Sequence, residues 1–349
     1  MERDGTDRTD GRGGRDLVVI GASAGGVETL KRVAADLPAG LKAAICVVLH
    51  IAPESPSALA SILRRSGPLP CHPAREGERL HLGEIVVAPP DRHLVIEDRH
   101  VHLTVGPREN GHRPAVDVLF RSAAANGDGR VVGVVLSGTR DDGAAGLAAI
   151  KANGGATIVQ DPDDALYAGM PTSALAHVAV DAVVPSERVA STVEAMVTGS
   201  FEPEPTPDPT GGGGGNPGSG TAGGPRVTTV CPECGGVLTE RPEAGVTQWE
   251  CRVGHRYSPK SLVDAQAQDV EAALWAAVRI LEDRVALLHR MAHQAEARQG
   301  KRSARSFRTR ADAAAEHAHK VREVLTTAAT TTLALGNADQ GAEEEESAA

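Results

Sequence analysis

Three sets of candidate reactive side chains follow apolar runs that are typical of buried strands. Ser23 lies in a Gly-rich turn after LVVIGA, His50 follows AAICVVL, and the acidic pair Asp141 and Asp142 follows VVGVVLSG. A serine hydroxyl becomes a nucleophile when a base removes its proton, and a carboxylate fixes the tautomer of that base. Parallel strands place their carboxyl ends at one edge of a sheet, where open α/β folds hold their sites. These residue types therefore indicate serine hydrolase chemistry at that edge.

The turn around Ser23 permits three interpretations when it is taken alone. The spacing G-x-S-x-G from Gly21 to Gly25 is that of a nucleophile elbow, in which a strand-to-helix turn exposes a serine near backbone amides. A phosphate-binding turn is the second interpretation, although the dinucleotide fingerprint needs Gly where Ser23 stands. The third is a tight connection without chemistry. The order Ser, His, Asp also differs from that of the α/β-hydrolases, which counts against their fold.

A second set of candidate residues lies near the C-terminal third of the chain. Cys231 and Cys234 form a C-x-x-C pair, and Cys251 and His255 follow at C-x-x-x-H spacing. Three thiolates and one imidazole are the ligands of a closed tetrahedral zinc site. A redox C-x-x-C is the alternative, but a thioredoxin-like βαβ context is missing. The sequence predicts a structural Zn²⁺ site, whose metal would supply folding energy to a module with little core of its own.

The elements that must position the reactive residues follow a repeated strand–turn–helix order. Apolar strands at 17–22, 43–49, 131–136 and 157–160 alternate with amphipathic helical segments, which predicts a doubly wound, mainly parallel sheet with helices on both faces. Short alternating runs between residues 84 and 105 predict a small antiparallel excursion. His81 and His93 lie near or within these runs and are expected to be structural or surface residues.

Composition divides the chain into segments. Residues 200–226 are rich in Pro and Gly and predict a linker. Beyond the zinc module, apolar residues recur at spacings of four and three from Leu274 to Ala292, which indicates a coiled coil or helical hairpin. The predicted segments are a disordered tail (1–15), an α/β domain (16–199), the linker, the zinc module (227–260), the helices (261–335) and an acidic disordered tail (336–349).

Five blocks of sequence stand out along residues 16–198. They are VVIGASAGG, VVLHIAPES, RPAVDVLFRSAA, VVLSGTRDDGAAGLAAIKANGG and QDPDDALYAGMP. Together they resemble the catalytic domain of the chemotaxis protein-glutamate methylesterases, in the order of that family. Members of the family are serine hydrolases that cleave γ-glutamyl methyl esters on cytoplasmic helices of chemoreceptors, and some also deamidate receptor glutamines. The resemblance implies this activity without a catalytic cofactor.

The resemblance also implies roles for individual residues. By position in the blocks, Ser23 is the nucleophile, His50 the base and Asp142 the orienting acid. Asp141 has no role in the family pattern, and we expect it to be a solvated loop charge.

Two positions depart from the family pattern. Ala24 follows the nucleophile where many members have Thr, and Thr139 stands where many have Met near the oxyanion site. Both departures bear on rate or substrate preference. The well-known members carry a receiver domain before the catalytic domain, and we expect none here because fifteen polar residues precede Asp16.

Composition and the resemblance together limit the partners. The net charge is −10 and aromatic residues make up 2% of the chain, which argues against nucleic acid as the main partner. No apolar run is long enough to insert in a membrane, and five unevenly spaced cysteines favour the cytoplasm over a disulfide framework. We expect methylated receptor-type helices as partners and C-terminal helices able to pair two chains as a homodimer. The alternative to an esterase is a non-catalytic signalling adaptor assembled by the zinc and helical segments.

Overall fold

The computed structural model describes residues 14–52, 57–202 and 229–346, with the backbone alone in 328–346. The predicted N-terminal tail and linker fall almost entirely outside these ranges. The chain divides into two compact units, residues 1–263 and 264–349. No helix in the described ranges is long and apolar enough to cross a membrane.

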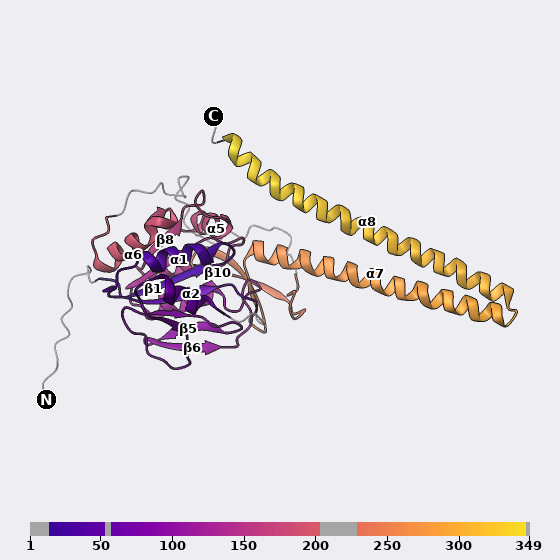
Figure 1. The fold of residues 1–349 in the computed structure, drawn as a ribbon, viewed down its shortest axis with the longest axis horizontal. Helices are drawn as coiled ribbons and strands as arrows, with labels where there is room; N and C mark the ends of the chain where they lie inside the picture. Colours follow the sequence, from indigo (N-terminus) through magenta and orange to yellow (C-terminus); the bar gives the residue numbers. More distant parts are fainter. Residues whose placement is uncertain (1–13, 53–56, 203–228, 347–349) are drawn as a thin grey trace. The chain divides into compact units, whose positions relative to one another are not determined.

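A seven-stranded parallel sheet forms the centre of the first unit (Figure 1). Val and Ile dominate its inner strands, and all six residues of both β1 and β2 are buried. The strand order is β3-β4-β2-β1-β7-β8-β9. The strands are β1 (Leu17–Ala22), β2 (Ala44–Leu49), β3 (Cys71–Pro73), β4 (Ile85–Val87), β7 (Val131–Val135), β8 (Ala156–Gln160) and β9 (Ala182–Val184).

Helices cover both faces of this sheet, which confirms the doubly wound prediction. One hydrophobic cluster joins the sheet to α1, α2 and α6. The other joins it to α3, α4, α5 and an antiparallel hairpin of β5 and β6. The bounds are α1 (Gly26–Asp36), α2 (Leu59–Ser66), β5 (His93–Glu97), β6 (His100–Thr104), α3 (Val116–Asn126), α4 (Ala144–Ala152), α5 (Gly169–His177), a 3₁₀ turn (Ser186–Arg188) and α6 (Val189–Thr198).

The strand order places a topological switch point beside β1. The chain leaves β1 through α1 toward β2, and it leaves β7 through α4 toward β8 on the opposite side. The connections therefore diverge between the adjacent strands β1 and β7, and such a divergence opens a crevice at the carboxyl ends of the strands. Ser23, His50 and Asp142 follow β1, β2 and β7 at this edge.

The remaining elements of the first unit form a small module. An antiparallel sheet consists of β10 (Leu238–Glu243), β11 (Val246–Cys251) and β12 (Arg256–Tyr257). The helix α7 (Pro259–Ala297) begins directly after it. This module clusters with the α/β domain rather than forming a separate unit.

Two long helices, α7 and α8 (Lys301–Glu346), build the second unit and pack as a hairpin (Figure 1). Val278, Leu288 and Ala292 of the predicted seam are buried, as are Ala311 and Ala318 of α8. The structure thus selects a hairpin within one chain, and pairing between chains stays a prediction. The backbone of α8 continues to Glu346, into the segment 336–349 that the sequence analysis expects to be a disordered tail. Ala, Gln and Glu in this stretch favour helix.

Candidate functional site

The Ser23 turn is shaped by two glycines at the start of α1. Gly25 has φ +75°, and a Cβ there would lie 2.7 Å from Ser137 Oγ. A Cβ at Gly26 would lie 2.5 Å from Ala22 Cβ. Larger residues would therefore open the turn. The Ser23 hydroxyl has no hydrogen-bond partner within the described ranges, and the side chain faces a cavity of about 520 Å³.

His50 lines the same cavity and is held by the end of β2. Its backbone N–H donates to Ala22 O at 3.2 Å, which ties it to β1. Its Nε2 lies 2.7 Å from Asp142 Oδ2, and its side chain is only 6% exposed. Because Nε2 is engaged by the carboxylate, Nδ1 is the ring nitrogen left for proton transfer to or from the cavity.

Asp142 is completely buried beneath His50, where the start of α3 supplies its donors. Val116 N–H donates to Oδ2 at 2.7 Å, and Asp117 N–H donates to Oδ1 at 3.1 Å. Burial alone would raise the pKa of Asp142, but the hydrogen bond and charge of His50, with the Val116 N–H, hold that pKa below its ordinary value. Asp142 is therefore an anion at neutral pH.

Two further side chains complete the surroundings of Asp142. Asn110 donates its Nδ2 to Asp142 Oδ1 and to Asp117 Oδ2, both at 3.1 Å. Asp117 Oδ1 accepts the N–H groups of Gly143 and Gly146 at 3.0 and 2.7 Å. Burial and the charge of Asp142 raise the pKa of Asp117 well above its ordinary value. Asp117 thus joins α3 to α4 directly behind this edge of the sheet.

His112 is a site residue that the sequence analysis missed. Its ring stacks on His50 with centroids 3.7 Å apart and planes 9° from parallel, and it lines the cavity. Burial, followed by the charge of His50, lowers the pKa of His112 to about 3. A lone histidine in a loop carries no sequence signal for such a contact.

The expectation for Asp141 is wrong. The residue is only 7% exposed, and its carboxylate accepts hydrogen bonds from the hydroxyls of Ser258 and Ser261. The module that contains β12 covers Asp141 and excludes solvent from its carboxylate. His93 has the predicted structural role, because its buried ring contacts Pro107 O at 2.9 Å.

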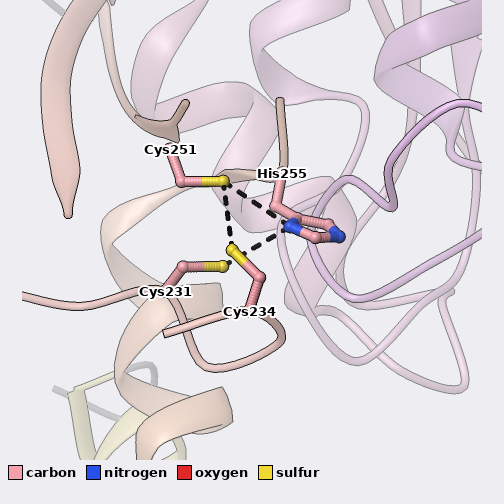
Figure 2. A group of neighbouring side chains, drawn as sticks. All are labelled: Cys231, Cys234, Cys251 and His255. Atoms are coloured by element: carbon pink, nitrogen blue, oxygen red, sulfur yellow. Dashed lines mark hydrogen bonds between the residues drawn. The ribbon is translucent and has the colours of Figure 1, made fainter. Parts of the chain in front are cut away.

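The four predicted metal ligands converge in the module (Figure 2). Cys234 Sγ lies 3.7 Å from Cys251 Sγ, and His255 Nδ1 lies 3.5 Å from Cys251 Sγ and 3.6 Å from Cys231 Sγ. Tetrahedral bonds of about 2.3 Å to sulfur and about 2.0 Å to nitrogen place ligand atoms about 3.5–3.8 Å apart. His255 Nε2 contacts Glu233 Oε2 at 3.3 Å, which orients the ring with Nδ1 toward the sulfurs.

The other two cysteines are ordinary buried thiols, as predicted. Burial raises the pKa of Cys46 to about 12 and that of Cys71 to about 11. Neither thiol belongs to the cluster of Cys231, Cys234, Cys251 and His255.

Known proteins resemble this chain over the α/β domain. A relative from Leptospira interrogans is 39% identical over 176 residues, which cover 50% of this chain and 91% of the relative. A protein from Methanosarcina acetivorans named protein-glutamate methylesterase/protein-glutamine glutaminase 2 is 36% identical over 187 residues, and the chain covers 52% of its length. The crystal structure of the Thermotoga maritima CheB methylesterase catalytic domain matches with TM-score 0.51 and 31% identity, over 52% of this chain and 99% of that one.

The family model described as CheB methylesterase matches residues 18–193, about half of the chain. This range contains Ser23, His50 and Asp142, the strands that carry them and the cavity that the first two share. The chain belongs to the CheB methylesterase family.

Proposed function

We propose that this protein is a serine esterase that removes methyl groups from glutamate methyl esters of chemoreceptor-type signalling proteins. The observation that carries the proposal is the 2.7 Å contact between His50 Nε2 and the buried Asp142, beside a cavity that also holds Ser23. Substrate class is inferred from the names of relatives such as the Methanosarcina acetivorans protein. Deamidation of glutamine is a second reaction of the same acyl chemistry.

In the proposed mechanism, His50 Nδ1 removes the Ser23 proton as Oγ attacks the ester carbonyl. The oxyanion is stabilised by the N–H groups of Ala24 and Gly25, which line the cavity and donate to no acceptor within the described ranges. The His50 proton then passes to the leaving methoxide, which departs as methanol. Water, deprotonated by His50, cleaves the acyl-enzyme and restores the glutamate carboxylate and the Ser23 hydroxyl.

Asp142 and His112 favour the charge changes that this mechanism needs. The Asp142 anion stabilises the His50 imidazolium and fixes the tautomer in which Nδ1 accepts a proton. His112 stays neutral at physiological pH because its pKa is about 3, so it adds no positive charge beside that imidazolium.

We also propose that Cys231, Cys234, Cys251 and His255 hold a structural Zn²⁺. The support is the separation of the donor atoms and the orienting contact from Glu233. Four protein ligands close a tetrahedral site, so the metal would stabilise the fold rather than bind substrate. A reducing compartment such as the cytoplasm suits a chain whose described cysteines are all free thiols.

The test of the esterase proposal is methanol release from a methylated chemoreceptor cytoplasmic fragment. Ser23→Ala should lower kcat at least ~10³-fold, because both acyl transfer steps need the hydroxyl. Ser191→Ala removes an exposed hydroxyl on α6 and should leave release unchanged. A fluorophosphonate probe should label the wild type and not the Ser23→Ala variant.

Two outcomes contradict the proposal. Undiminished methanol release by Ser23→Ala would exclude Ser23 as the nucleophile. Failure of the probe to label folded wild-type protein, together with tight binding of the receptor fragment and no methanol release, would favour the adaptor alternative.

A further inference from the structure

The module of residues 229–260, called here the zinc-site module after its proposed metal, contacts the loop that precedes α3. Asn110 N–H donates to Arg256 O at 2.8 Å, and Arg256 N–H donates to Arg108 O at 3.3 Å. Ser258 N–H donates to Asn110 Oδ1 at 2.9 Å, a contact that joins residues 148 positions apart in sequence. Strand β12 and the residue after it therefore lie directly along the loop that carries Asn110.

A second contact lies beneath the start of α7. Ser258 Oγ accepts the Ser261 N–H at 3.0 Å, an N-terminal helix cap, and donates to Asp141. Ser261 Oγ donates to the same carboxylate at 2.6 Å. All three residues are buried. The Asp141 carboxylate is therefore stabilised by two hydroxyl donors and by the N-terminus of α7 in place of water.

A third contact fixes the other side of the module. Arg121 of α3 pairs with Glu109 and also lies 3.5 Å from Glu243 of β10, which in turn pairs with Arg256. Val246 of β11 is 4% exposed and belongs to the hydrophobic cluster of the α/β domain. The module is thus held by the apolar contact of Val246 and the ion pairs of Arg121, in addition to the hydrogen bonds at Asn110 and Asp141.

The orientation of the Asn110 amide links this docking to Asp142. An amide has an acceptor end and a donor end, and Ser258 N–H engages the acceptor Oδ1. The donor Nδ2 is thereby directed at Asp142 Oδ1 and Asp117 Oδ2. With the opposite orientation, an amide oxygen would face two carboxylates, and Ser258 N–H would face an NH₂ group. Ser258 therefore selects the orientation that holds Asp142 in place.

We propose that the docked module is a working part of the active site, in which Ser258, through Asn110, positions Asp142 for its contact with His50. Ser258 and Asn110 are positioning residues, because neither lines the cavity that holds Ser23. The inference rests on the proposed esterase mechanism. Ser258 follows the predicted metal ligand His255 by three residues, so a metal that fixes His255 would also restrict the backbone of residues 256–258, which contact the Asn110 loop.

The test is a pair of module variants in the full-length protein. Ser258→Pro with Ser261→Ala removes the backbone N–H that donates to Asn110 Oδ1 and both hydroxyl donors to Asp141, and it leaves every residue of the α/β domain unchanged. We expect kcat to fall at least about tenfold, with KM within about twofold of the wild type. Ser191→Ala with Thr239→Ala removes two exposed hydroxyls and should have wild-type kcat. Active-site titration with the fluorophosphonate corrects each rate for the fraction of folded enzyme.

A double-mutant cycle with Asn110→Ala separates positioning from general stabilisation. If the module acts through Asn110, adding the two serine substitutions to Asn110→Ala should lower kcat less than about twofold further. The rate of hydrogen exchange at the Val116 and Asp117 amides, which donate to Asp142, should rise both in the double serine variant and in Asn110→Ala.

Three results would overturn the inference. The first is a wild-type kcat in the double serine variant. The second is a triple variant whose fold-loss in kcat equals the product of the losses in the double serine variant and in Asn110→Ala. The third is a loss of activity that the titration explains wholly by unfolded protein. Each differs from failure of the esterase proposal, in which Ser23→Ala itself would retain activity.

Discussion

His112 stacks on His50 without competing with it for protons. Its pKa falls from 6.5 in an exposed histidine to about 3 in the folded protein, chiefly because of burial. Between these pH values the unfolded chain binds a proton at this position that the folded chain does not. Stability is therefore unaffected by His112 above about pH 6.5 and falls as the pH decreases toward 3.

Replacing His112 should reduce this acid sensitivity. For a histidine that stays neutral in the folded state, each pH unit below about 6.5 lowers the free energy of unfolding by about 1.4 kcal/mol. Between about pH 7 and pH 5, the free energy of unfolding of the wild type should therefore fall by about 2 kcal/mol more than that of His112→Phe. Urea denaturation followed by circular dichroism measures the difference. His81→Phe, at an exposed histidine, should keep the wild-type pH dependence. Equal pH dependence in His112→Phe would mean that His112 is protonated in the folded state.

At the scale of elements, the catalytic edge depends on how closely α3 approaches β1. A Cβ at Gly21 would lie 2.2 Å from Val116 Cγ1 and 2.8 Å from Cγ2. The same Val116 donates its backbone N–H to Asp142. Glycine in β1 therefore lets the helix N-terminus reach the buried carboxylate.

Gly21→Ala should displace α3 and weaken the site. We expect the free energy of unfolding to fall by about 1–3 kcal/mol, as in overpacked cores, and kcat to fall because the Val116 N–H moves away from Asp142. Adding Val116→Ala removes both clashing methyl groups and should restore part of both losses. Gly40→Ala, with open space around its new methyl, is the control. Normal kcat and stability in Gly21→Ala would show that α3 can shift without cost.

At the scale of the whole molecule, the zinc-site module extends the α/β domain and has little core of its own. In the described ranges its buried apolar side chains are few, among them Leu238, Val246 and Tyr257. The proposed metal and the docking contacts would therefore supply most of its stability.

Measurement of the zinc content of the purified wild-type protein should find one zinc ion per chain. Cys234→Ser with Cys251→Ser should reduce this to below about a tenth, because two of four ligands are lost. Limited proteolysis of that variant should cut within 229–258 and leave 14–202 intact. Cys71→Ala, a thiol outside the cluster, should retain the metal. A full zinc content in the double variant would place the metal elsewhere.

Local pattern was sufficient for much of the fold and part of the site. Apolar runs placed Ser23 and His50 at strand ends, and a Gly-rich turn marked Ser23, since strand burial and turn geometry depend on neighbouring residues. The spacing of Cys231, Cys234, Cys251 and His255 predicted a cluster for the same reason. The sequence could not predict that Asp141 is buried, because the serines covering it lie 117 and 120 residues away.

The sequence by itself determined which residues can react, which can bind metal and which strands carry them. Only the tertiary structure decided that Asp142 meets His50, that His112 stacks on His50, and that Asn110 joins the module to Asp142. The first group depends on short-range spacing and residue type. The second depends on complementary surfaces brought together from distant parts of the chain, whose burial and hydrogen bonds form only when the whole unit folds.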